Sequence, residues 1–133
     1  MPALLLAAAP AQAGDRAELF RHRYVSTAVI KDGERRQLFE GTKIRLDFEH
    51  RADYDVVRWQ ADCNVFGADV DVTEKLLVTG QIEGTSQGCP KARLRRDRWM
   101  LRFFRSDPRW RIPREGRLKL RAGDRVIRLR RRD

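Results

Sequence analysis

Few residues in this chain have the side chains and the spacing that catalysis or metal binding requires. The sequence has two cysteines, Cys63 and Cys89, and two histidines, His22 and His50. It contains no H-E-x-x-H or C-x-x-C pattern, so the common zinc-ligand spacings are missing. It also contains no G-x-S-x-G or comparable setting for a nucleophile. We therefore expect no catalytic residue, no metal site and no cofactor, and we expect that the protein is not an enzyme.

Two groups of carboxylates are the remaining candidates for chemistry. The segment 69–74 (DVDVTE) could suggest calcium, but it lacks the other ligands and the glycine of an EF-hand loop. Asp47 and Glu49 share one side of a predicted strand, and Arg45 and Arg58 are close enough to pair with them. Exposed ion pairs explain this arrangement more simply than a pair of catalytic carboxylates does.

The strong positive charge distinguishes the composition of the chain. Lys and Arg number 29 against 19 Asp and Glu, which gives a net charge of +10. Such a balance favours an anionic partner: nucleic acid, an acidic membrane surface or an acidic polymer. The alternative is that the charges only solvate the surface, because they are spread along the whole chain. The best candidates for anion binding lie near the C-terminus: Arg125, Arg128, Arg130, Arg131 and Arg132.

Three tryptophans could help such a chain to bind nucleic acid. Small barrels hold single strands by pairing a basic groove with stacked aromatic rings. Trp59, Trp99 and Trp110 could supply the rings. Side chains of this size bury a large apolar area, however, and they more often belong to the core. We therefore expect them in the core.

The first 13 residues differ from the rest of the chain. An apolar run at positions 4–9 (LLLAAA) precedes Ala11-x-Ala13, a small-x-small pattern that is typical of signal-peptide cleavage. We predict a signal-peptide remnant over residues 1–13 and a mature domain over 14–133; a plain Ala-rich tail is the alternative. The run is too short to span a bilayer, and no cysteine near it could form a lipobox. We therefore expect an exported protein without an acyl anchor.

The cysteine count is consistent with export. One pair of cysteines allows a single intramolecular bridge, Cys63–Cys89, which suits an oxidising compartment. Closing a loop of this length would stabilise the fold by about 3 kcal/mol, because it restricts the unfolded chain. Two buried free thiols are the alternative.

Alternating apolar and charged residues predict a mainly β domain. Ile44, Leu46 and Phe48 alternate with charged residues over 44–49, which is typical of a strand with one buried face. Similar patterns predict further strands over 21–31, 57–61, 65–72, 75–82, 117–121 and 125–130. The period changes to helical spacing over 90–105. This order predicts a small antiparallel β-barrel of about seven to eight strands with one α-helix late in the chain.

The residues around the two cysteines resemble the motifs of a known family. The stretch 61–68 (ADCNVFGA) is similar to the Cys-Asn-x-x-Gly signature of META domains, the family of HslJ-like heat-shock and envelope proteins. The stretch 82–90 (IEGTSQGCP) is similar to the second motif of that family, a Thr followed shortly by a small residue and Cys. The predicted helix and the last hairpin come where the family has them. The resemblance covers most of residues 21–130.

The resemblance implies a small antiparallel barrel in an exported or envelope protein, and some members of the family are linked to stress responses. No catalytic residue is established for the family, so none is carried over. Structural roles are expected for the other motif residues: Asn64, Gly67, Thr85, Gly88 and Pro90. Asp62 stands where the family commonly has Gly, and Gln87 replaces its usual Met, so the packing of these loops needs explanation.

These observations together predict a non-catalytic exported META-type domain with a role in protein interaction or stress tolerance. Its partner would be an envelope protein or an anionic surface, because export would separate the protein from nucleic acid. The alternative is a basic module that binds nucleic acid or another anionic polymer.

Overall fold

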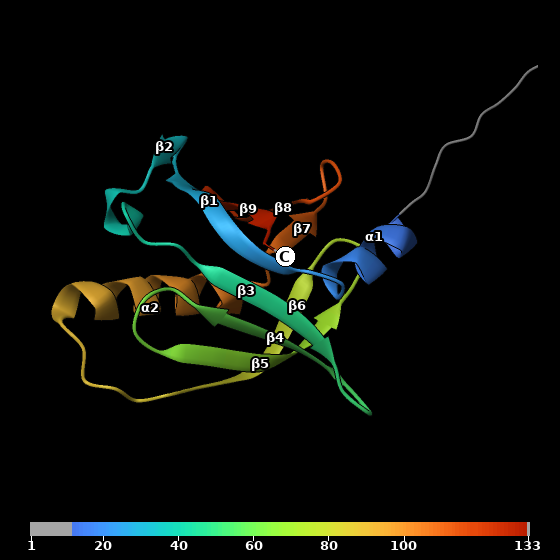
Figure 1. The fold of residues 1–133 in the computed structure, drawn as a ribbon, viewed down its shortest axis with the longest axis horizontal. Coiled ribbons are helices and arrows are strands. Elements are labelled where there is room, and N and C mark those ends of the chain that lie inside the picture. Colours follow the sequence, from blue (N-terminus) through green and yellow to red (C-terminus); the bar gives the residue numbers. More distant parts are fainter. Residues whose placement is uncertain (1–11, 133) are drawn as a thin grey trace, which may run out of the picture.

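One antiparallel sheet forms most of the protein and curls over a helix that comes late in the chain (Figure 1). The computed structural model describes residues 12–132. In chain order the elements are α1 (Gln12–Leu19), β1 (Arg23–Lys31), β2 (Glu34–Arg35), the 3-10 helix η1 (Gln37–Phe39), β3 (Arg45–His50), β4 (Asp55–Gln60), β5 (Val65–Val72), β6 (Leu77–Gly84), α2 (Lys91–Arg105), β7 (Arg109–Arg111), β8 (Arg117–Ala122) and β9 (Arg125–Arg131).

The strand order makes the sheet a curled half-barrel. It runs β6-β5-β4-β3-β1-β9-β8-β7, and β2 pairs with the end of β1. β9 therefore lies beside β1, and the last hairpin joins the first strand. Among the described residues, the two edges of the sheet touch only near the start of β6 and of β7. There the N–H of Leu77 donates to the carbonyl of Pro108 (2.9 Å), and the N–H of Trp110 donates to the carbonyl of Lys75 (3.0 Å).

The segments with alternating patterns form strands, as predicted. Leu46 and Phe48 of β3 are buried, whereas the residues beside them are partly or fully exposed. Leu118, Leu120 and Ala122 of β8 are buried in the same way. The predicted mainly β class with one late helix is confirmed. The described residues form nine strands rather than seven to eight, since β2 and β7 have only two and three residues, too few for a pattern to reveal.

Helix α2 begins directly after Pro90 and packs its apolar side against the sheet. Its Phe104 ring stacks on Trp59 with the ring centroids 4.1 Å apart. Trp59, Trp99 and Trp110 are at most 3% exposed. The expectation that the tryptophans belong to the core is confirmed, and none of them can serve as an exposed platform for stacking bases.

Helix α1 is an element that the sequence pattern does not predict. It spans Gln12–Leu19, so it crosses the expected boundary between residues 13 and 14. Leu19 is fully buried, and the Tyr24 hydroxyl donates to the carbonyl of Glu18 (3.1 Å), which ties the end of the helix to β1. Residues 1–11 of the predicted signal-peptide remnant lie outside the described residues. Between residues 12 and 132, no helix is long and apolar enough to cross a membrane.

Candidate functional site

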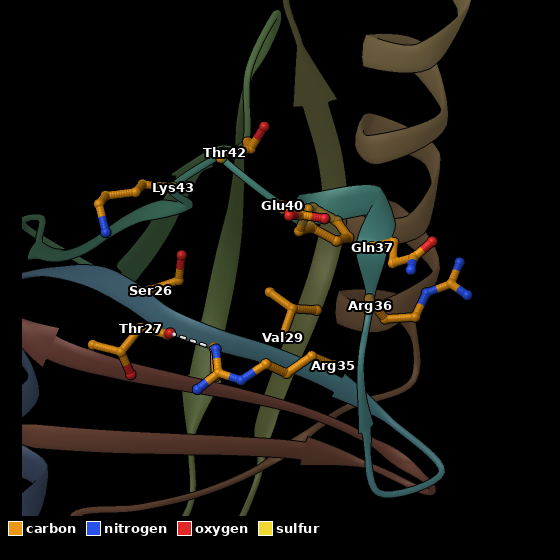
Figure 2. A pocket seen from close by; sticks show the side chains of 12 residues that line it. Ser26, Thr27, Val29, Arg35, Arg36, Gln37, Glu40, Thr42 and Lys43 are labelled. Carbon is orange, nitrogen blue, oxygen red and sulfur yellow. Dashed lines mark hydrogen bonds between the residues drawn. The ribbon is translucent and has the colours of Figure 1, made fainter.

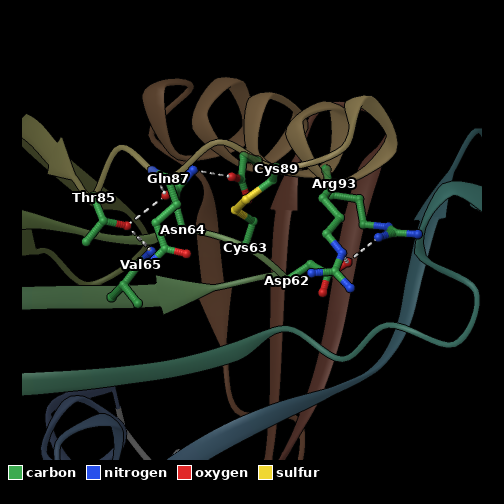
Figure 3. The surroundings of a disulfide bond; sticks show 10 residues. Asp62, Cys63, Asn64, Val65, Thr85, Gln87, Cys89 and Arg93 are labelled. Carbon is green, nitrogen blue, oxygen red and sulfur yellow. Dashed lines mark hydrogen bonds and ion pairs between the residues drawn. A yellow bond between two sulfur atoms is a disulfide. The ribbon is translucent and has the colours of Figure 1, made fainter.

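A disulfide joins two loops at one end of the sheet. Cys63 lies between β4 and β5, Cys89 lies in the segment that leads into α2, and their Cα atoms are 6.4 Å apart. This separation is within the range that disulfides require. Figure 3 shows the bridge beside the first turns of α2. The predicted Cys63–Cys89 bridge is therefore present, and the alternative of two free thiols is not.

Three polar residues complete what we call the disulfide corner, which consists of Cys63, Cys89, Asn64, Thr85 and Asp97. The side-chain oxygen of Asn64 accepts hydrogen bonds from the Thr85 hydroxyl (2.8 Å) and from the backbone N–H of Gln87 (2.8 Å). Its amide nitrogen donates to Oδ2 of Asp97 (3.0 Å). The Asn64 side chain is buried, and each of its bonds connects one element to another. This geometry supports a structural role for Asn64 and Thr85. Position 87 contributes its backbone N–H to the corner, so Gln in place of the usual Met keeps this hydrogen bond.

Asp97 is the member of the disulfide corner that sequence reasoning missed. It lies on the buried side of α2 and is only 4% exposed. Burial raises the pKa of its carboxyl above the usual 3.8, and the hydrogen bond from Asn64 offsets only part of this effect. Its second oxygen, Oδ1, has no hydrogen-bond partner among the described residues. The only feature of the sequence that points to Asp97 is its helical spacing from Met100 and Phe104, which puts this acidic residue on the buried side of α2.

Asp62, which stands where the family commonly has glycine, forms ion pairs with two arginines of α2. The Asp62 carboxylate pairs with the guanidinium of Arg96 and, at 3.4 Å, with that of Arg93. Arg96 also donates from Nε to the carbonyl of Leu38 (2.7 Å) in η1. An acidic residue in place of glycine therefore adds a connection between the Cys-Asn turn, the helix and the η1 segment.

The remaining motif residues have different surroundings. A Cβ at Gly67 would lie 3.2 Å from Cγ of Arg58, which agrees with a close approach between β4 and β5. The irregular register in β5 falls between Ala68 and Val70 rather than at Gly67 itself. A Cβ at Gly88 would meet no atom within 4 Å. The carbonyl of Pro90 accepts from the first free N–H groups of α2.

The carboxylates of β3 form ion pairs with arginines. Arg58 of β4 lies opposite Asp47 and pairs with it (3.9 Å) and with Glu49. Arg58 therefore forms the ion pairs that the sequence predicts, whereas Arg45 forms none within the described part of the chain. Within residues 12–132, no three His, Cys, Asp or Glu side chains converge as metal ligands would.

A hollow of about 450 Å³ lies between the middle of β1 and the segment 35–43 (Figure 2). It exists because β1 pairs with β3 only over 23–25 and with β2 only over 30–31. Side chains occupy part of this exposed edge. Nη1 of Arg35 donates to the carbonyl of Thr27 (3.4 Å), and Oγ of Ser26 accepts from the N–H of Ile44 (2.8 Å). Side chains beside the hollow therefore supply some of the hydrogen bonds at the edge of β1 where β3 turns away.

A second feature is the outer side of the last three strands, which we call the basic face. It consists of Arg109, Arg111, Arg117, Lys119, Arg121, Arg128 and Arg130. These residues alternate with core residues such as Trp110, Leu118 and Leu129, so they point away from the core. None of the seven forms an ion pair with an acidic residue in the described part of the chain.

Strand register brings like charges of the basic face directly opposite one another. The opposed pairs are Arg109 with Arg121, Arg111 with Lys119, Lys119 with Arg128, and Arg117 with Arg130. Lys119 lies between two arginines in this arrangement. Burial, followed by the charges of Arg111, Arg121 and Arg128, lowers the pKa of Lys119 below its usual 10.5.

The structure does not bring the five C-terminal arginines together in one site. Neighbouring residues of β9 point to opposite sides of the sheet. Arg128 and Arg130 lie on the basic face, and the exposed Arg132 follows the end of β9. The positive surface therefore comes from three strands rather than from one consecutive run.

The other two C-terminal arginines make contacts elsewhere. Arg125 donates to Oγ of Ser106 (3.3 Å), and its guanidinium carbon lies 5.9 Å from the centre of the Trp99 ring. Arg131 pairs with Glu115 (3.7 Å). Both side chains therefore serve contacts within the fold.

Comparison with known proteins agrees with this fold and with the motif. The chain belongs to the META domain family, whose model matches residues 17–133. The NMR structure of a protein from Burkholderia xenovorans is similar, with a TM-score of 0.69 and 16% identity over 98% of this chain and 94% of that one. A second NMR structure has a TM-score of 0.62 and 14% identity over 86% of this chain and 92% of that one. No curated protein matches the chain. At these identities the likeness to solved structures establishes the fold alone.

Proposed function

We propose that this META domain is a non-catalytic interaction protein that acts in the cell envelope or after secretion and contributes to stress tolerance. The observation that carries the proposal is the disulfide corner. Its Cys63–Cys89 bridge suits an oxidising compartment, and the polar groups of the family motif are engaged in holding the fold together.

Export is supported by two independent features. The first is the bridge, since disulfides rarely persist in a reducing cytosol. The second is the apolar run at 4–9 with Ala11-x-Ala13 after it, which has the composition of the end of a signal peptide.

The burial of the perturbed carboxyl supports a non-catalytic role. Asp97 has a raised pKa, which is a property that active sites often use. Only 4% of it is exposed, however, and its bonded neighbour Asn64 is buried as well. A substrate has no access to this carboxyl in the folded protein, so a structural role explains it better than acid catalysis does.

An experiment on the full gene tests export. The gene is expressed in a host that exports proteins, and the envelope, medium and cytoplasmic fractions are analysed by intact mass. We expect a chain that begins at Gly14 outside the cytoplasm. A double variant, Ala11→Leu with Ala13→Leu, should block processing and is the matched control. A chain that retains Met1 in the cytoplasm would contradict the proposal.

A deletion strain tests the role in stress tolerance. Cells without the gene should survive heat or antibiotic exposure less well than their parent. The wild-type gene should restore survival, whereas the processing-blocked variant should not. Equal survival of deletion and parent strains would contradict this part of the proposal.

The alternative, a basic module for an anionic polymer, is favoured by one observation only. The basic face has seven positive side chains without acidic partners among the described residues. The buried tryptophans remove the stacking contribution that single-stranded nucleic acid would need.

A further inference from the structure

The opposed like charges of the basic face contrast with the rest of the sheet. On β3 and β4, Asp47 lies opposite Arg58. Lys31 of β1 lies opposite Glu34 of β2 on one side and opposite Arg125 of β9 on the other. Strands β7, β8 and β9 contain no acidic residue, so no such neutralised pair can form among them. Four opposed pairs of the basic face are positive, and in a fifth Arg121 lies opposite Val126. Like charges in these positions destabilise a sheet, so the arrangement calls for an anion from outside the chain.

A hollow in the same face provides a place for such an anion. It has a volume of about 270 Å³. Its basic lining residues are Arg111, Arg114, Arg117, Lys119 and Arg128. A water molecule occupies about 30 Å³ in the liquid, so the hollow has room for a phosphate or pyrophosphate group. Thr27 also lines it, and its hydroxyl donates to the carbonyl of Arg128 (3.3 Å).

The chemistry of the lining suits phosphate. Guanidinium groups present forks of donors that match phosphate oxygens, and several of them can clamp one group from different sides. Lys119 adds a compact charge between Arg111 and Arg128. A bound dianion would relieve the repulsion that, together with burial, lowers the pKa of Lys119.

The basic face lacks the features that other anionic partners would use. The exposed large hydrophobic residues of the described chain are Tyr54 and Val65, and both lie in the β3–β5 region. The basic face therefore has no exposed aromatic ring on which bases could stack and no large exposed hydrophobic side chain to insert into a membrane, although Pro113, Leu118 and Leu129 line its hollow. Recognition here depends on charge and hydrogen bonds.

We propose that the hollow on the outer side of β7–β9 is a binding site for a phosphate group with at least two negative charges, either free or on a lipid headgroup. The site does not depend on the proposed export, because the same side chains would bind phosphate in any compartment. The export experiment and the binding experiment can therefore fail independently.

Titration with sodium pyrophosphate tests the site. Isothermal calorimetry on the wild-type chain should show saturable binding that weakens as salt increases. Lys119→Gln should weaken binding at least tenfold, because it removes the central charge. Arg98→Gln is the matched control, since it removes one positive charge from an exposed position on α2. We expect the control to change affinity less than twofold.

Melting temperatures provide a readout that does not depend on calorimetry. Without ligand, Lys119→Gln should melt above the wild type, because it removes two like-charge oppositions. Pyrophosphate should raise the melting temperature of the wild type and of Arg98→Gln, but not that of Lys119→Gln. Arg128→Gln is a second probe of the same hollow and should behave like Lys119→Gln.

Vesicles identify the source of the phosphate. Phosphatidylcholine vesicles containing 30% phosphatidic acid are compared with pure phosphatidylcholine. Binding to the acidic vesicles that pyrophosphate displaces would identify a lipid headgroup, and binding of pyrophosphate alone would identify a soluble phosphate. The proposal is overturned if pyrophosphate shows no saturable binding, if Lys119→Gln and Arg98→Gln weaken it equally, or if duplex DNA binds while pyrophosphate does not.

Discussion

The side chains of Asn64 and Asp97 are joined by a 3.0 Å hydrogen bond, although 33 residues separate them in the sequence. Asn64 follows the bridged Cys63, and Asp97 lies on the buried side of α2. Through Thr85 and the backbone of Gln87, the same asparagine also holds the segment between β6 and α2. One side chain therefore connects the sheet, the helix and the loop that the disulfide closes.

Replacing Asn64 with Ala should strongly destabilise the protein. It would leave the Asp97 carboxylate and the Gln87 N–H without their partner in a buried place. Unsatisfied buried groups of this kind cost about 3 kcal/mol together. Urea unfolding measures the loss. Gln81→Ala removes an exposed amide and should change the free energy of unfolding by less than about 0.5 kcal/mol. Equal effects of the two substitutions would contradict the role of Asn64.

Replacing Asp97 with Asn should change how stability depends on pH. Because burial raises the pKa of the folded carboxyl above 3.8, protonation of Asp97 stabilises the fold at low pH. That contribution is fully present below pH 3.8 and is lost as pH rises through the higher folded pKa. Above the folded pKa of Asp97, the neutral amide should therefore be more stable than the wild type.

Urea unfolding from pH 3 to pH 7 checks this prediction. The advantage of Asp97→Asn should shrink as pH falls and should vanish once both forms are neutral. A variant that is less stable than the wild type at pH 7 would show instead that the fold requires the charged carboxylate.

Gly84 and Gly88 should respond differently to the same substitution. A Cβ at Gly84 would overlap the ring of Phe66, which packs beside Trp59 in the core. Gly84→Ala should therefore destabilise the fold by about 2 kcal/mol, because the ring must move. Gly88→Ala meets no atom and is the matched control, with a change below about 0.5 kcal/mol.

Thermal unfolding of the two alanine variants measures the difference. Placing Gly84→Ala in a Phe66→Ala background should remove most of the cost. A cost that persists there would mean that the backbone, rather than the ring, requires glycine at this position.

Removing the disulfide should weaken the fold without abolishing it. Cys63→Ala with Cys89→Ala frees a loop with a sequence separation of 26, which costs about 3 kcal/mol through the entropy of the unfolded chain. The core of the sheet and α2 stays packed, so circular dichroism should still report a mainly β protein. Loss of all structure on reduction would contradict the view that the core holds the fold by itself.

The sequence predicts those parts of the fold that depend on local patterns. The alternation of Leu46 and Phe48 with charged residues identifies β3, and the change of period after Pro90 identifies α2. β7 escapes prediction because three residues cannot show a period. Its place is fixed instead by bonds such as the one from the Trp110 N–H to the carbonyl of Lys75, between segments that are distant in the sequence.

The candidate sites were harder to predict because they too depend on contacts between segments that are distant in the sequence. The bridge follows from having two cysteines, but the partners of Asn64 depend on how α2 lies against the sheet. A basic run near the C-terminus draws attention to β9. Because side chains of β9 alternate between the two sides of the sheet, only Arg128 and Arg130 of this strand lie on the basic face. Lys119 comes from β8, which pairs with β9. Cross-strand register is not visible in a single sequence.

The most direct test of the account is the thiol state of the protein taken from its own compartment. Cells expressing the full gene are denatured in iodoacetamide, and the chain is weighed before and after reduction. We expect no label on Cys63 or Cys89 without reductant and two labels after it, since the bridge forms where the protein acts. Two labels without reductant would place the chain in a reducing compartment and contradict both the export and the bridge.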